Sequence, residues 1–186
     1  GSSKFGENHK WGNFWSLGFS WRLNEESFLK DISWINSLKY RISYGVTGTD
    51  GIDPYRYGDY YSLGLNYMGQ TGISHTNLPN PDLGWEQNNS LSMGLDFTLF
   101  NMLTGTIEAY NKLTTDLLLD VNVPYTTGFS TIFKNVGKIQ NRGLEVELSA
   151  NLLKESQLKW TPSLTFTHNQ NKIKSLPQDE IISGTK

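Results

Sequence analysis

A strict alternation of apolar and polar side chains runs through most of this 186-residue chain and points to β-structure. Successive side chains of a strand face opposite sides of a sheet, so each alternating stretch predicts a strand with one apolar and one polar face. The predicted strands cover residues 15–23, 38–46, 91–99, 144–152 and 158–166, and a longer sixth strand keeps its parity from residue 103 to residue 123. The sequence therefore predicts an all-β fold.

The length of these strands bears on what their apolar faces meet. Nine residues at about 3.3 Å each span roughly 30 Å. Tilted by about 40–45°, such a strand stands on the order of 22 Å tall, close to the ~25 Å apolar band of an outer-membrane barrel. A soluble extracellular β-sandwich that binds carbohydrate would show the same alternation, with its apolar faces buried against a second sheet. The height favours lipid, and the sandwich is the alternative interpretation.

The connections between the predicted strands alternate in length. Residues 100–102 and 153–157 predict short turns, whereas residues 48–86 form a long connection rich in Gly, Asp, Tyr, Asn and Pro. Membrane barrels combine short periplasmic turns with long extracellular loops in this way. Six strands cannot close a barrel whose outer face is apolar, because the smallest such barrels have eight. The chain is therefore expected to be part of a larger barrel.

Two local features qualify this layout. Residues 24–36 carry apolar side chains at helical spacing behind Asn24, which predicts one short periplasmic-side helix with Asn24 as its N-cap. Pro162 lies inside a predicted strand and cannot donate a backbone hydrogen bond there. That strand is therefore expected to be an edge strand, bulged or locally unpaired at the proline.

Several motifs, in one order along the chain, resemble the barrel of SusC/RagA-type TonB-linked (TonB-dependent) outer-membrane transporters. They are GSSKFG at 1–6, FWS at 14–16, WRL at 21–23, EESF at 25–28, LKYRISYGVTG at 38–48, NPDLGWE at 80–86, TDLL at 115–118, TGF at 127–129, NVG at 135–137, NRGLE at 141–145 and NQNKI at 169–173. The chain departs from the family pattern at Thr49, where Asn is usual, and at Gly84, where Lys is usual. The resemblance extends over nearly the whole sequence.

This resemblance implies a 22-stranded antiparallel transmembrane β-barrel in the outer membrane of Bacteroidetes-like bacteria. It implies a nutrient importer for oligosaccharides or peptides, with a SusD-like surface lipoprotein as its lid and a TonB-type protein as its energy-coupling partner. Residues 1–186 are expected to be part of one barrel domain, from its C-terminal part. The plug domain and the final strands are expected to lie outside this chain.

The residues indicate no enzyme. The chain has no cysteine, and His9, His75 and His168 lack the spacing of metal ligands. No nucleotide-binding fingerprint is present, and Glu145 and Glu147 are ordinary carboxylates for a wet barrel lumen. A net charge of -2 gives no field suited to nucleic acid. We therefore expect no metal, no cofactor and no nucleic-acid partner.

Aromatic side chains in the long connection are the best candidates for contact with substrate or lid. These tentative site residues are Tyr55, Tyr57, Tyr60, Tyr61 and Tyr67. Rings with a polar tip stack on sugars or peptide side chains and suit a partner surface. The alternatives are that the tyrosines pack the loop on itself or join the aromatic girdle. Four tryptophans are expected in that girdle or facing lipid, namely Trp11, Trp15, Trp21 and Trp160.

Overall fold

The computed structural model describes residues 1–6, 8–54, 56–152 and 159–177, and its architecture is all-β and antiparallel. Six strands form one sheet in the order β1 (Trp15–Arg22), β2 (Ile35–Thr49), β5 (Glu86–Leu99), β6 (Leu103–Thr115), β9 (Lys138–Ala150) and β10 (Ser163–Ser175). Two further hairpins are formed by β3 (Tyr61–Tyr67) with β4 (Gln70–His75), and by β7 (Leu118–Asn122) with β8 (Thr131–Asn135). Within these ranges, no helix has the length and apolar character needed to cross a bilayer.

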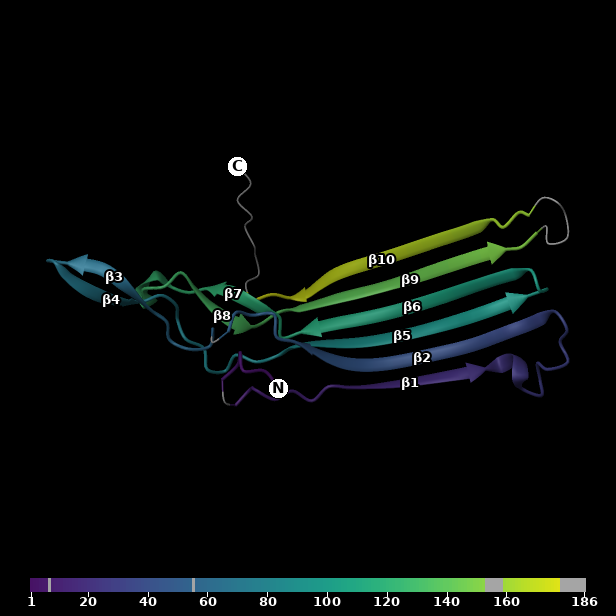
Figure 1. The fold of residues 1–186 in the computed structure, drawn as a ribbon, viewed down its shortest axis with the longest axis horizontal. Coiled ribbons are helices and arrows are strands. Elements are labelled where there is room, and N and C mark those ends of the chain that lie inside the picture. Colours follow the sequence, from purple (N-terminus) through teal and green to yellow (C-terminus); the bar gives the residue numbers. More distant parts are fainter. Residues whose placement is uncertain (7, 55, 153–158, 178–186) are drawn as a thin grey trace.

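The two ends of the six-stranded sheet differ (Figure 1). One end carries short connections, and the other carries the long loops together with both extra hairpins. The predicted tight turn between β5 and β6 is confirmed: Phe100 and Asn101 have φ of 54° and 51°, and Met102 N–H donates to Leu99 O at 3.0 Å. Two consecutive positive φ angles match the strand twist of a hairpin. The predicted turn at 153–157 lies outside the described residues.

The strand register gathers the alternating side chains into two distinct faces. One row of register partners crosses the whole sheet as Trp21, Tyr40, Leu95, Ile107, Val146 and Phe166. The row displaced by one residue belongs to the other face and reads Ser20, Arg41, Gly94, Glu108, Glu145 and Thr167. We call the first side the belt face, and the second the polar face. The alternation predicted along single strands therefore holds across all six.

The apolar band on the belt face runs obliquely across the sheet. Toward the long-loop end, the continuous apolar band ends at Trp15 on β1, Val46 on β2, Leu91 on β5, Ala109 on β6, Leu144 on β9 and Phe166 on β10. Leu113 on β6 is a further apolar side chain of this face, separated from the band by Asn111. The boundary of the continuous band falls by six residues, or three belt-face rows, over five strand-to-strand steps, which is about 20 Å along the strands for about 24 Å across them. The resulting angle is about 40°, the tilt at which barrel strands cross a bilayer.

The buried core lies beyond the sheet, at its long-loop end. Phe5 and Leu83 are fully buried and pack with Ile52, while large side chains of the belt face, such as Leu17 at 71% exposure, are open. The described residues place no second sheet over either face. The sandwich alternative is therefore wrong, because its apolar rows would have to be covered by protein. An open, one-layer sheet is what a segment cut from a barrel wall presents.

The structure changes three predicted elements. The strand predicted over 103–123 is interrupted at Asp116, whose φ of 56° turns the chain out of the sheet and into the β7–β8 hairpin. The helical turn on the short-connection side is a 3₁₀ helix, η1 (Leu23–Glu25), and not a helix over 24–36. Asn24 does not cap it, because its Oδ1 accepts the N–H of Leu38 at 3.0 Å.

The strand predicted around Pro162 begins one residue after it, at Ser163. Pro162 O still accepts the N–H of Ala150 at 3.0 Å, so the hairpin pairing continues past the end of β10. Pro162 thus lies just before the strand and not inside it as the sequence predicted, so the strand loses no backbone donor to the proline.

Candidate functional site

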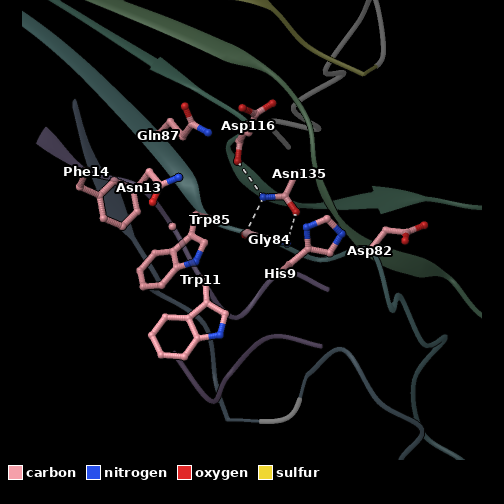
Figure 2. Close-up of a pocket in the computed structure, with 11 residues that line it drawn as sticks. His9, Trp11, Asn13, Phe14, Asp82, Gly84, Trp85, Gln87, Asp116 and Asn135 are labelled. Carbon is pink, nitrogen blue, oxygen red and sulfur yellow. Dashed lines mark hydrogen bonds between the residues drawn. The ribbon is translucent and has the colours of Figure 1, made fainter. Parts of the chain in front are cut away.

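A pocket of ≈ 420 Å³ lies where the N-terminal segment meets the ends of the long connections (Figure 2). We call it the loop-base pocket. Its lining residues are His9, Trp11, Gly12, Asn13, Phe14, Asp82, Gly84, Trp85, Gln87, Asp116 and Asn135. They come from residues 9–14, from residues 82–87 and from the two ends of the β7–β8 connection, at 116 and 135. Only Gln87 and Asn135 lie within strands. The pocket therefore depends on how these stretches are held together.

The side chain of Asn135, at the end of β8, holds the pocket together. Its Oδ1 accepts the N–H of Gly84 at 2.7 Å, and its Nδ2 donates to Gly84 O at 2.8 Å and to Asp116 O at 3.1 Å. Asn80 provides a second tie, because its Nδ2 donates to Phe133 O at 2.7 Å. The NPDLGWE and NVG motifs, about fifty residues apart in sequence, are thus one structural unit.

Aromatic rings form one wall of the pocket. Trp85 packs with its ring centroid 5.1 Å from Phe5, on the buried core, and 5.1 Å from Phe14, in the tilted and edge-on arrangements that rings prefer. Its Nε1–H is buried and has no hydrogen-bond partner among the described residues. Trp11 also lines the pocket and is 83% exposed. A fixed ring and a free ring therefore border the same space.

The rest of the lining is polar and has no positively charged Lys or Arg. Asp82 and Asp116 contribute exposed carboxylates, and amides come from Asn13, Gln87 and Asn135. Gly84 stands where the family usually has Lys; a Cβ there would only touch the His9 ring at 3.5–3.6 Å. The chain thus has room at this position and lacks the cation. Aromatic faces beside carboxylates and amides suit hydroxyl-rich or cationic groups better than anions.

The structure places the predicted tyrosines elsewhere in the same loop. Tyr57 is half-buried against the Phe5, Ile52 and Leu83 core. Tyr60 donates its OH to Pro54 O at 2.6 Å, and Tyr61 in β3 lies 4.5 Å from the His75 ring. None of these three lines the loop-base pocket. Tyr55 lies outside the described residues, and Tyr67 ends β3. A role for the tyrosines in substrate or lid contact stays a prediction.

The polar face carries an ion-pair cluster in the middle of the wall. Arg41 donates through Nε to Asp96 Oδ2 at 3.1 Å and through its terminal nitrogen to Glu108 Oε2 at 2.8 Å. Arg41 reaches Glu108 by lying across Gly94, where a Cβ would be 2.6 Å from its Nε. Glu145 is the register partner of Glu108 on β9. These charged groups lie on the polar face, opposite the belt face. Charged side chains are typical of the water-facing side of a barrel strand.

The comparisons with known proteins agree with this geometry. The family model described as "TonB dependent receptor-like, beta-barrel" matches residues 1–185. This chain belongs to that family. TonB-dependent receptor P39 of Formosa agariphila is 39% identical over 181 residues, which are 97% of this chain and 17% of that protein. TonB-dependent receptor SusC of Bacteroides thetaiotaomicron is 36% identical over 186 residues, covering 95% of this chain and 18% of that protein.

Solved structures resemble this TonB-dependent receptor barrel segment as well. The RagAB peptide importer in its "open-open" state matches with a TM-score of 0.87 and 27% identity, over 98% of this chain and 20% of that chain. Its "closed-closed" state matches with a TM-score of 0.83 and 29% identity, over 92% and 19%. The chain spans about a fifth of the length of the proteins it matches. It is thus a segment of a barrel wall with its loops.

Reasoning from sequence missed the residues of the loop-base pocket. Trp11 was expected in the girdle or facing lipid, yet it borders the pocket. Asp82, Asp116 and Asn135 each lie in a motif that carries the resemblance, but no local pattern shows that the motifs meet. The sequence feature that could have indicated the pocket is Gly84, which departs from the family pattern and lines the pocket.

Proposed function

We propose that residues 1–186 form part of one barrel domain of an outer-membrane nutrient importer. The observation that carries this proposal is the oblique apolar band, whose slope of about 40° matches strands tilted in a bilayer. The family match and the likeness to SusC and to RagAB support it. The imported cargo is an oligosaccharide or a peptide, and uptake depends on a TonB-type coupling protein that acts through parts of the transporter outside this chain.

The long-loop end faces the cell exterior in this proposal. Short connections at the opposite end fit the periplasmic side, as in other outer-membrane barrels. A SusD-like surface lipoprotein then covers the loops that carry β3–β4 and β7–β8. The exposed aromatic side chains of this end, including Tyr61 at 55% and Tyr125 at 92%, support a contact surface there.

The loop-base pocket gives this end a place for cargo. Its aromatic wall and its carboxylates, without Lys or Arg, favour neutral hydroxyl-rich or cationic groups over anionic ones. Trp11 offers a free ring face for stacking. Because Asn135 ties this pocket to both hairpin-bearing connections, a cargo bound there contacts the same residues that position the loops.

Uptake by whole cells tests the proposal. Cells that lack the gene are supplied with oligosaccharides or with peptides as the sole carbon source, and monosaccharides or amino acids serve as controls. We expect growth to fail on one of the two polymer classes, to return with the wild-type gene, and to be normal on the monomers. Growth of the deletion strain at the wild-type rate on both oligosaccharides and peptides would contradict the import function.

A pair of tryptophan variants tests the pocket separately from the barrel. Trp11→Ala removes the free ring at the pocket, whereas Trp15→Ala removes a ring from the belt face four residues later. One aromatic contact is worth about 0.5–1.5 kcal/mol, so Trp11→Ala should weaken cargo binding by about twofold to thirteenfold. Isothermal titration of the full-length transporter measures this. Equal affinities of the two variants would exclude Trp11 from the cargo site.

A further inference from the structure

The belt face changes from apolar to basic on β9 and β10, toward the long-loop end. Beyond the last apolar positions, Leu144 and Phe166, the register brings one more set of side chains together. This set is Asn111 on β6, Lys138, Gln140 and Arg142 on β9, and His168, Gln170 and Lys172 on β10. Three of its members are permanently cationic. On β6, Leu113 remains apolar beside Gln140. The same rows on β1 and β2 are still apolar, with Leu17, Tyr44, Trp15 and Val46.

Acidic side chains lie on only one face of the described six-stranded sheet. Among the described strands of the six-stranded sheet, no belt-face position holds an acidic residue, while Glu108, Glu145 and Glu147 all lie on the polar face. Lys138 and Lys172 consequently form no ion pair with any described residue. Unpaired cations on one side of a thin wall create a positive potential there.

A hydrogen bond to a neighbouring strand fixes the position of the Arg142 guanidinium. Its Nε donates to Gln170 Oε1 at 2.7 Å, and the flanking Gln140 donates through Nε2 to Asn111 Oδ1 at 2.6 Å. These bonds leave the two terminal nitrogens of the guanidinium unpaired within the described chain. The residues border an open hollow of ≈ 510 Å³, with Leu144 and His168 among its lining. A guanidinium fixed in this way suits the oxygens of a phosphate group.

The hollow also lies at a defined depth. It starts at Leu144, the last apolar residue of the band on β9, and extends from there toward the long-loop end, which is where a bilayer changes from hydrocarbon to headgroups. We propose that this hollow, lined by Arg142 and flanked by Lys172 as the register partner of Gln140, binds the phosphate of a lipid headgroup in the leaflet on the long-loop side. The apolar surface of Leu144, Val146 and Phe166 then receives the acyl chains of that same lipid.

The lipid is the source of phosphate that the surroundings favour. A free phosphate ion would meet the cations but would gain nothing from the apolar surface directly below them. A lipid headgroup gains from both the cations and the apolar surface, because its phosphate and its acyl chains belong to one molecule. Binding at this hollow uses the outer wall of the barrel and is independent of any cargo in the loop-base pocket.

Native mass spectrometry of the full-length transporter tests the site. The probes are a lipid A that carries phosphate monoesters, the same lipid after enzymatic removal of its phosphates, and inorganic phosphate. We expect the phosphorylated lipid to be retained at least tenfold more strongly than the other two probes. Equal retention of the dephosphorylated lipid would overturn the role of phosphate, and equal binding of inorganic phosphate would overturn the role of the acyl chains.

Charge-matched variants locate the binding. Arg142→Gln and Lys172→Gln remove belt-face cations, and Lys112→Gln removes a cation from the polar face of β6. We expect each of the first two to lower lipid retention several-fold, and Lys112→Gln to leave it unchanged. An electrophoretic shift on heating confirms that every variant is folded. Equal retention of the phosphorylated lipid by all three variants would refute the site. The site would also be refuted if the first two variants changed only the oligomeric state of the transporter and left lipid retention unchanged.

Discussion

Substitution of Leu95 by Arg tests whether hydrocarbon lies against the belt face. Leu95 is the middle one of five apolar belt-face positions on β5, from Leu91 to Leu99, and its register partners Tyr40 and Ile107 belong to the same band. Each end of the band is four residues away, or about 13 Å along the strand. With the slope of about 40°, this places Leu91 and Leu99 about 10 Å above and below the midplane.

The magnitude follows from that depth. An Arg at the midplane of a barrel costs about 2–4 kcal/mol, and near the interfaces about 0–1 kcal/mol. We therefore expect Leu95→Arg to lower the folding equilibrium constant by roughly 30-fold to 1,000-fold. Leu99→Arg should lower it less than about tenfold, because its charged head reaches the interface. Leu95→Ala is the control for loss of the leucine side chain. The difference in folding equilibrium constant between Leu95→Arg and Leu95→Ala reports the cost of placing a charge at this depth.

The assay is the folded fraction of the full-length barrel in lipid vesicles, measured by its electrophoretic shift on heating. Ser92→Arg is the control on the polar face of the same strand, where Ser92 pairs in register with Ser43 and Tyr110. Its folded fraction should be close to that of the wild type. The reasoning is refuted if Leu95→Arg folds as well as Ser92→Arg, since the belt face would then not meet lipid.

Three further predictions concern contacts within the chain. Asn135→Ala removes three hydrogen bonds and should destabilise the base of the loops by about 1–3 kcal/mol; faster hydrogen exchange around residue 84 than in Asn122→Ala would show it. Gly143→Ala places a Cβ 2.8 Å from a backbone oxygen and should cost about 1–3 kcal/mol of stability, whereas Gly18→Ala, with nothing within 4 Å, should be tolerated when folded yields are compared. Arg41→Met should cost about 1 kcal/mol or less because the ion pairs are part-exposed, and a loss that does not shrink between 0.1 and 1 M salt would exclude an electrostatic cause.

The strands were predictable because the environment of each side chain on a strand follows from its parity. The stretches around Leu95 and Val146 read correctly for this reason, and so did the tight turn at Asn101. Asp116 shows that the alternation of apolar residues does not predict where a strand ends. The parity of the apolar positions continues past it, so the period alone predicts one strand. The chain nevertheless turns there, where Asp116 O accepts the side-chain amide of Asn135 from β8.

The site was far less predictable than the fold. The predicted tyrosines lie in the expected loop, but the pocket is built from Trp11, Asp82 and Asn135, which belong to stretches far apart in sequence. No local pattern records that Asn135 bonds to Gly84, because an amide side chain finds backbone partners of many kinds. The family motifs marked these residues without showing what they do.

The residue pattern was sufficient to establish the all-β class, the two-faced strands and the division into short and long connections. Those properties depend on neighbours one or two positions apart. The slope of the apolar band, the meeting of the two loop motifs and the basic hollow around Arg142 depend on strand register and on long-range contacts. Backbone hydrogen bonds are the same for every residue, so the pairing of distant strands is fixed by the whole folded sheet and not by any one segment of it.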